Sequence, residues 1–192
     1  MIRTGLTHSL GGKRVLIIMG IDPGTATTGY GVVVLRAGAL TSLEYGTIDT
    51  PAGLSLPARL EQIFNRMHAL LEAFQPDAVA VEELFFSRNT TTAFSVGQAR
   101  GVFLLAAAQR RVPVAEYTPH QVKQAVTGQG RAEKRQVAFM VRALLGLKEF
   151  PKPDDAADAL AIAICHAHHH MTATRMARLD AGGAGILGGR ER

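Results

Sequence analysis

The sequence predicts an α/β protein with one mixed β-sheet and helices on both faces of that sheet. Two observations lead to this prediction. First, three strand-like stretches joined by glycines and short polar links come at the start of the chain, a pattern typical of an antiparallel meander. Second, helical and strand-like patterns alternate over the rest of the chain, which adds strands to the sheet and helices to its two faces.

The elements of the first half follow from their residue patterns. The meander strands are expected at about 14–22, 30–36 and 40–50. Apolar residues then recur at spacings of three and four between Leu56 and Phe74, which predicts a helix that Pro76 ends. The short Val- and Ala-rich stretch "DAVAVEEL", residues 77–84, is typical of a buried central strand.

The second half alternates helices with one more strand. A helix is expected at about 90–110, a strand over "VPVAEYTP" and a third helix over "HQVKQAVTG" after Pro119. The glycine-rich basic loop "GQGRAEKR" leads into a fourth helix, and the last helix begins after Pro153. The fourth helix has one apolar face, formed by Val137, Met140, Val141, Leu144 and Leu145.

One domain is expected, because 192 residues suit a single hydrophobic core and no internal repeat is present. Residues 1–12 have no hydrophobic periodicity, which predicts a flexible N-terminal extension. Residues 13–171 carry the periodic patterns of the folded domain. Residues 172–192 are rich in Ala, Gly and Arg, and we expect them to form a disordered basic tail.

Composition narrows the classes of partner. A net charge of +5 favours polyanions, with nucleic acid before an anionic membrane surface. The single cysteine, Cys165, excludes an intrachain disulfide and fits a cytoplasmic location. No apolar segment reaches the ~18 residues that a membrane-spanning helix needs, so no membrane role is expected.

Acidic residues stand at the ends of predicted elements, where a core has no use for a charge. Asp22 ends the first strand directly before a Pro-Gly turn, and Glu82 and Glu83 end the fourth strand. Asp155 and Asp158 open the last helix three residues apart, so they project from one helical face. Ligands of open α/β sheets collect at the carboxyl ends of strands, which is where the first two sets lie.

Carboxylates brought together repel one another unless cations neutralise them, and such oxygen ligands suit Mg²⁺ or Mn²⁺. Two such cations a few ångströms apart are a standard device for in-line attack on a phosphodiester. Each acid also has a structural explanation. An Asp before Pro-Gly is a common turn residue, Asp154 or Asp155 is a favourable helix N-cap, and Glu83 can face solvent.

Two further signals carry less weight. His166 and His170 lie four residues apart, a spacing able to bind a transition metal, but a frayed and solvated helix end is favoured because no other ligands accompany them. The loop "GQGRAEKR" either contacts phosphates or is a mobile linker, and it lacks the Walker pattern.

Five segments together resemble a known family. "GIDPGTATTGYGVV", "VAVEELFF", "GQARGVFLLAA", "QVKQAVTGQGRAEKRQVAFMVRALL" and "DDAADALAIAICHAH" resemble, in the same order, the blocks of the RuvC Holliday-junction resolvases. The resemblance covers about residues 14–170. It implies a ribonuclease-H-like fold with a mixed five-stranded sheet, a homodimer, Mg²⁺ dependence, and paired symmetrical cuts in four-way junction DNA during recombination and repair.

The resemblance also implies which residues act. Asp22, Glu82, Asp155 and Asp158 match the catalytic acids, which hold two Mg²⁺ ions, with Mn²⁺ as a substitute. Phe85, with Phe86 beside it, matches the aromatic residue that family members push into the junction core. The other residues expected to contact DNA are Arg88, Lys123, Arg131 and Lys134.

Two rival functions stay open at this point. "DPGTATTGYG" also resembles the first phosphate loop of actin-like and sugar-kinase ATPases, although those proteins need two lobes and a second phosphate loop. A junction-binding module without cleavage is the other rival, and the intact set of acids argues against it. The RuvAB branch-migration complex is a further candidate partner.

Overall fold

The computed structural model of the chain describes residues 9–10, 13–83 and 90–183. Its centre is a sheet with the strand order β4-β3-β2-β5-β6. The strands are β2 (Lys13–Asp22), β3 (Thr27–Arg36), β4 (Ala39–Asp49), β5 (Ala78–Glu82) and β6 (Val114–Tyr117). The first three pair antiparallel, whereas β5 runs parallel to β2 and β6 parallel to β5, as the sequence predicts.

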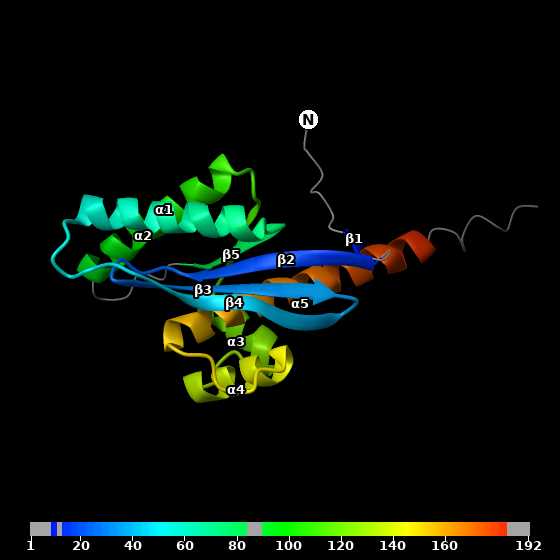
Figure 1. The fold of residues 1–192 in the computed structure, drawn as a ribbon. Coiled ribbons are helices and arrows are strands. Elements are labelled where there is room, and N and C mark those ends of the chain that lie inside the picture. Colours follow the sequence, from blue (N-terminus) through cyan, green and yellow to red (C-terminus); the bar gives the residue numbers. More distant parts are fainter. Residues whose placement is uncertain (1–8, 11–12, 84–89, 184–192) are drawn as a thin grey trace, which may run out of the picture.

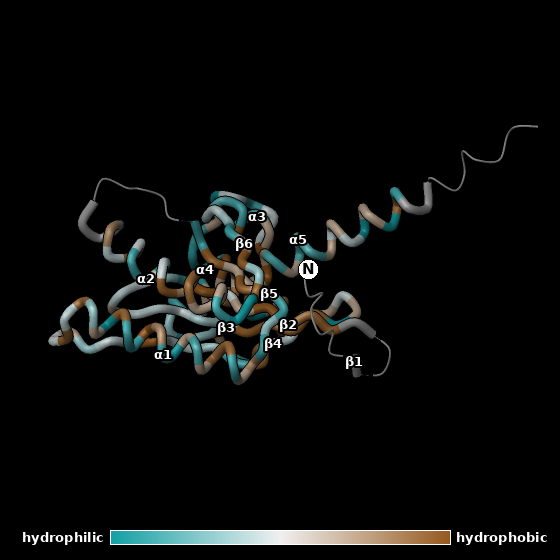
Figure 2. The backbone as a smooth tube through the Cα atoms, turned by 90° about the horizontal axis from the view of Figure 1, so that it is seen from above, coloured by the Kyte–Doolittle hydropathy of each residue, from teal (hydrophilic) through white to brown (hydrophobic). Residues whose placement is uncertain are grey.

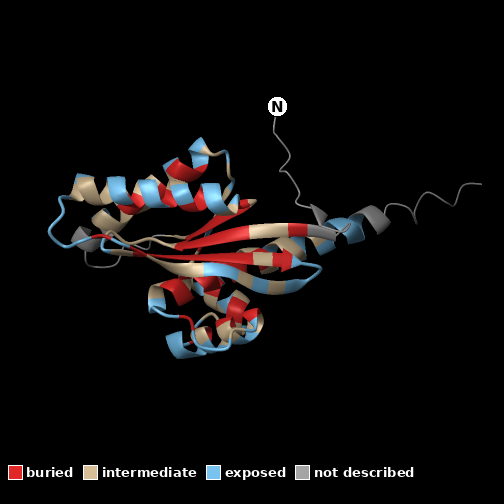
Figure 3. Cartoon of the chain, viewed as in Figure 1, coloured by how far each residue is buried: buried red, intermediate tan, exposed pale blue. Residues whose placement is uncertain are grey.

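Helices cover both faces of the sheet (Figure 1). They are α1 (Leu56–Phe74), α2 (Thr90–Gln109), α3 (Pro119–Thr127), α4 (Lys134–Leu145) and α5 (Asp154–Gly183). One apolar cluster joins one face of the sheet to α1 and α2, and a second joins the other face to α3, α4 and α5. Buried residues lie on the inner sides of the helices, and exposed residues lie on their outer sides (Figure 3).

Side-chain alternation along the strands assigns residues to the two faces. Ile18 belongs to the cluster under α3–α5, whereas Met19 and Ile21 belong to the cluster under α1 and α2. On β5, Ala80 likewise packs towards α3–α5, and Val79 and Val81 pack towards α1 and α2. Because side chains alternate along a strand, this pattern also fixes where the acids at the strand ends point.

Two glycines let α5 lie directly on the sheet. A Cβ atom at Gly20 would sit 2.0 Å from the carbonyl oxygen of Ala159, and one at Gly29 would sit 1.9 Å from that of Asp155. No side chain fits in such a gap. The backbone of α5 therefore touches β2 at Gly20 and β3 at Gly29, and Gly29 is the residue that pairs with Asp22. The first turn of α5 therefore lies under the end of β2.

Three boundaries differ from the sequence predictions. The second meander strand begins at Thr27 rather than Tyr30, because the fully buried Thr28 pairs with β4. Ser9–Leu10 forms a short strand, β1, on the start of β2, so the prediction of a flexible extension over 1–12 is wrong for these two residues.

The prediction of a disordered tail over 172–192 is wrong for residues 172–183. There α5 continues as a helix to Gly183 and leaves the body of the molecule (Figure 2). Its buried first half supplies the nucleus that helix formation needs, and the following Ala, Met, Arg and Leu residues favour propagation.

Candidate active site

Asp22 is the last residue of β2 and lies on the face of the sheet that α5 covers. Ile18 and Gly20 share this face by alternation, and both meet α5 or its neighbours. Beside the strand end, the turn over 23–26 is held by two threonines. The hydroxyl of Thr28 donates to the Gly24 carbonyl at 2.6 Å, and that of Thr50 donates to the Thr25 carbonyl at 2.6 Å.

Glu82 ends β5 and points to the same face as Asp22. Ala80, two residues earlier, packs under α5, and side-chain alternation places Glu82 on this same face of the sheet. Glu83 lies on the opposite face, with Val79 and Val81. The sequence alone left the choice between the two glutamates even, and the family register favoured Glu82. In the structure, Glu82 belongs to the cleft and Glu83 is absent from its lining.

Asp155 and Asp158 complete a cluster of four carboxylates from three elements. The pKa of Asp22 is raised from 3.8 to about 7, first by burial and then by the charges of Asp158, Glu82 and Asp155, in that order. Burial also raises the pKa of Glu82, with Asp158 as the next contribution. Acids that are distant in the sequence therefore lie close enough in the fold for their charges to repel one another.

Two lysines stand at the same cleft. Lys134 Nζ donates to Asp158 Oδ2 at 3.1 Å, and this hydrogen bond raises the pKa of Lys134. Lys123 on α3 lines the cleft, and its charge lowers the pKa of Glu82. The cleft has a volume of about 340 Å³ and is lined by Asp22, Glu82, Pro119, Val122, Lys123, Lys134, Val137, Asp158, Ala161 and Ile162.

The donor chemistry of the cleft fits a hard divalent cation, since Asp22, Glu82 and Asp158 line it and the negative charges of Asp158, Glu82 and Asp155 help to raise the pKa of Asp22. Within the described ranges, however, no three His, Cys, Asp or Glu side chains are already grouped tightly enough to hold one metal ion. The ammonium group of Lys134 supplies the positive charge next to Asp158 in this arrangement.

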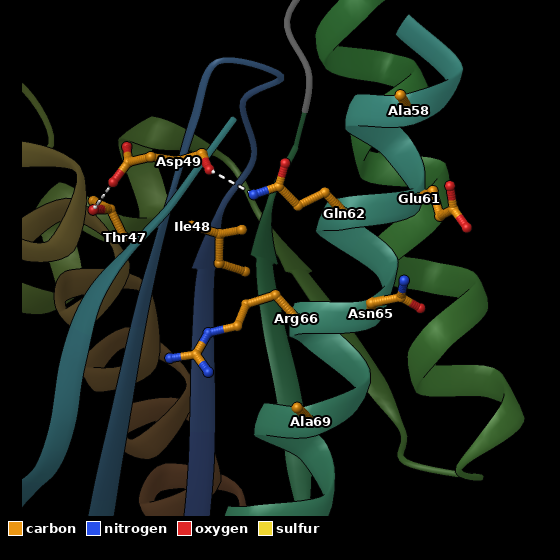
Figure 4. Close-up of a pocket in the computed structure, with 9 residues that line it drawn as sticks. All are labelled: Thr47, Ile48, Asp49, Ala58, Glu61, Gln62, Asn65, Arg66 and Ala69. Carbon is orange, nitrogen blue, oxygen red and sulfur yellow. Dashed lines mark hydrogen bonds between the residues drawn. The ribbon is translucent and has the colours of Figure 1, made fainter. Parts of the chain in front are cut away.

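A larger hollow of about 560 Å³ lies between α1 and the end of β4, on the other face of the sheet (Figure 4). One of its two acids, Asp49, is already engaged, because Thr27 and Thr47 donate to its two carboxylate oxygens at 3.0 and 2.8 Å, and the other is Glu61 of α1. Arg66 of α1 points into the hollow. None of the residues that the sequence singled out lines it.

The histidine-rich segment is part of the fold rather than a frayed helix end, so that prediction is wrong. His166 Nδ1 lies 2.9 Å from the Tyr117 hydroxyl, and His168 Nδ1 lies 2.9 Å from the Ala125 carbonyl oxygen. His169 packs against the ring of Tyr117 at a centroid distance of 5.0 Å. The sequence pattern gave no sign of these partners, because they lie about forty-five residues away along the chain.

The remaining predicted contacts fall into two groups. Arg131 lies in the exposed turn between α3 and α4, beyond the lining of the cleft. Phe85, Phe86 and Arg88 lie outside the described residues. Among the helices of the described chain, none is long and apolar enough to cross a membrane.

Comparison with known proteins gives consistent matches. Residues 18–166 match the family model described as crossover junction endodeoxyribonuclease RuvC. Proteins of that name from Syntrophomonas wolfei and Desulfitobacterium hafniense are 59% and 60% identical over 153 and 161 residues. These alignments cover 80% and 84% of this chain, and 89% and 98% of the two relatives.

Solved structures agree in fold. Thermus thermophilus RuvC in complex with a Holliday junction substrate is 44% identical, with a TM-score of 0.79 over 83% of this chain and 97% of that one. The yeast mitochondrial Holliday junction resolvase Ydc2 is 16% identical, with a TM-score of 0.58 over 79% of this chain and 78% of that one, and shares the fold. The mixed sheet is therefore of the ribonuclease-H-like type predicted from the sequence.

Proposed function

Because the chain belongs to the RuvC family of crossover junction endodeoxyribonucleases and is a Holliday-junction resolvase, we propose that it cuts four-way DNA at the cleft between Asp22, Glu82, Asp155 and Asp158. The observation that carries this proposal is the convergence of the four carboxylates at the carboxyl ends of β2 and β5. The actin-like ATPase alternative is not favoured, because residues 18–166 match the RuvC family model.

The acids have the role of cation ligands in this proposal. Asp22 ends β2 opposite Gly29 of β3, and the charges of the other three acids all act on it. Divalent cations bound there would supply an activated water for attack and stabilise the leaving 3′ oxygen. The rigid strand ends and the first turn of α5 hold the carboxylates in place for such ions.

The lysines have the role of phosphate contacts. Lys134 is bonded to Asp158 at 3.1 Å, so it loses this partner when Asp158 binds a cation, and its exposed ammonium group then faces DNA. Lys123 lies across the cleft on α3. Contacts to phosphates fix the position of the DNA without reading its sequence. Phe85, Phe86, Arg88 and Arg131 are proposed as further contacts on the strength of the family resemblance.

A homodimer is proposed from the outer face of α2. Phe94 is 68% exposed, Leu105 is 53% exposed, and the exposed Gly101 lies between them on the same side of the helix. Two copies joined through this face by a two-fold axis would present two clefts to a substrate with its own two-fold symmetry. Replacing Leu105 by Asp should convert the dimer to monomers in sedimentation and abolish paired cutting.

Junction cleavage tests the proposal directly. A labelled four-way junction incubated with the protein and Mg²⁺ should receive symmetrical nicks in two strands without ATP, and Mn²⁺ should substitute. Asp22→Asn should bind the junction and leave it uncut, with Glu83→Gln as the matched carboxylate control. ATP turnover without DNA cutting would refute the proposal. Association with RuvAB and a cytoplasmic location stay predictions from the sequence.

A further inference from the structure

Tyr117 is placed to connect the catalytic strands with the catalytic helix. It pairs with Glu82 in the parallel register of β5 and β6, and its carbonyl oxygen accepts a hydrogen bond from the Glu83 N–H at 2.8 Å. Its side chain is only 8% exposed and lies on the face covered by α5. Its hydroxyl lies 2.9 Å from His166 Nδ1, on the helix that carries Asp155 and Asp158.

The contact between Tyr117 and His166 has the chemistry of a neutral hydrogen bond. The pKa of His166 is lowered to about 4, first by burial and then by the charges of His170 and His169. The ring is therefore uncharged at neutral pH, with one nitrogen able to accept the phenolic hydrogen. The rings of His166 and His169 both pack against Tyr117, at centroid distances of 6.0 and 5.0 Å.

Two different anchors hold α5 across the sheet. On the β2–β3 side the helix backbone touches Gly20 and Gly29, as described above. On the β6 side, within the part of the chain that the structure describes, the Tyr117–His166 contact is the one side-chain hydrogen bond between α5 and the sheet. The glycines fix the distance of the helix from Asp22, and the hydrogen bond fixes its distance from the strand pair that ends in Glu82.

Neighbouring contacts extend the second anchor to α3. Cys165 Sγ lies 3.7 Å from the Gln121 carbonyl oxygen, and His168 Nδ1 lies 2.9 Å from that of Ala125. Lys123 stands between these two carbonyl groups in the sequence of α3 and lines the cleft. The stretch of α5 from Cys165 to His168 therefore contacts both the end of β6 and the helix that carries Lys123. Asp158 lies about two turns earlier on the same helix.

We propose that Tyr117 and His166 are positioning residues for junction cleavage, because their hydrogen bond sets the placement of Asp155 and Asp158 relative to Glu82. The inference rests on the proposed function of the cleft. Displacements of about 1 Å far from the reacting atoms are enough to slow an enzyme by one to two orders of magnitude. A bond that only stabilises the core would leave the cleavage rate of the folded protein unchanged.

Removal of the Tyr117 hydroxyl tests the inference. Tyr117→Phe should slow single-turnover cleavage at saturating junction by about tenfold, and should raise the Mg²⁺ concentration needed for half the maximal rate. Junction affinity measured without divalent cations should stay within about twofold of the parent. Tyr30→Phe is the matched control, because Tyr30 is also a buried sheet tyrosine, 5% exposed, but lies in the opposite core cluster.

A second pair of variants separates position from stability. His166→Asn keeps an acceptor near Nδ1 and should retain most of the parent rate, whereas His166→Leu should be as slow as Tyr117→Phe. Combining Tyr117→Phe with His166→Leu should slow cleavage no further, since both remove one interaction. These rates are compared at temperatures where thermal melts show every variant folded.

Each outcome bears on the inference. Equal cleavage by Tyr117→Phe and Tyr30→Phe overturns it, and so does a loss of rate in His166→Asn as large as in His166→Leu. A parent protein that cuts no junction overturns the proposed function and this inference with it. A parent that cuts, with a Tyr117→Phe variant that cuts equally well, overturns the inference alone.

Discussion

Asp22 should make the metal-free protein less stable as the pH rises, and Asp22→Asn should largely remove this effect. The folded pKa of Asp22 is about 7 against 3.8 for the free side chain, with burial as the main cause and the charges of Asp158, Glu82 and Asp155 next. Between these values the folded chain holds the proton more tightly than the unfolded chain. The free energy of unfolding therefore falls from about pH 4 to about pH 7 and is level above that range.

The size of the effect follows from the shift. The pKa of Asp22 rises by 7 − 3.8, or about 3. At 1.36 kcal/mol for each pKa unit, this corresponds to about 4 kcal/mol in the free energy of unfolding. Asp22 is only partly buried, so solvent screening reduces this to roughly 2 kcal/mol. For a protein of this length, that change moves the melting temperature by roughly 4–8 °C.

Thermal melts in a chelator at pH 5 and pH 8 measure the effect. The parent should lose roughly 4–8 °C more than Asp22→Asn between the two values, and Mg²⁺ at pH 8 should restore the parent far more than the variant. Glu83→Gln is the control, because Glu83 lies outside the cleft. An Asp22→Asn variant with the same pH dependence and the same response to Mg²⁺ as the parent would refute the electrostatic reasoning.

Three further predictions concern neighbouring residues. Glu82→Gln should be inactive in single-turnover cleavage across a Mg²⁺ titration while Glu83→Gln retains most activity, and the reverse result would move the site to the other face of β5. Gly29→Ala should lower stability by about 1–3 kcal/mol in denaturant melts, because its Cβ would meet the α5 backbone at 1.9 Å, whereas Gly53→Ala, with open space around it, should not. Phe85→Ala should fold normally but cut poorly, and a large loss of thermal stability with normal cutting would make Phe85 a core residue.

Much of the fold was predictable because several elements carry a clear hydrophobic period or a distinct composition. The spacing between Leu56 and Phe74 predicted α1 to within a residue at either end. The start of β3 was missed, because Thr27 and Thr28 have the composition of a turn and become strand only by pairing with β4. Residues 172–183 were missed because a helix without a buried face has no period to detect.

The sequence predicted which residue types line the candidate site, but it did not predict on which face of the sheet the site lies. Both faces of β5 are apolar, so alternation placed Glu82 and Glu83 on opposite faces without saying which face opens to α5. That information belongs to the packing of Ala80 against one core cluster and of Val81 against the other. The Tyr117–His166 contact could not be predicted from the sequence either, because it joins two residues that are forty-nine positions apart in the chain.

The close approach of α5 to the sheet and the repulsion among the acids have one cause. Gly29 lets the first turn of α5 touch β3 opposite Asp22, which brings Asp155 and Asp158 to the buried end of β2. A looser helix would relieve the repulsion that, after burial, raises the pKa of Asp22, but it would also separate the carboxylates that we propose as cation ligands. Lys134 offsets part of the repulsion from the surface, where an exposed ion pair contributes little. The packing that stabilises the core therefore holds the cleft in a state that a bound divalent cation would stabilise much more strongly than a lysine does.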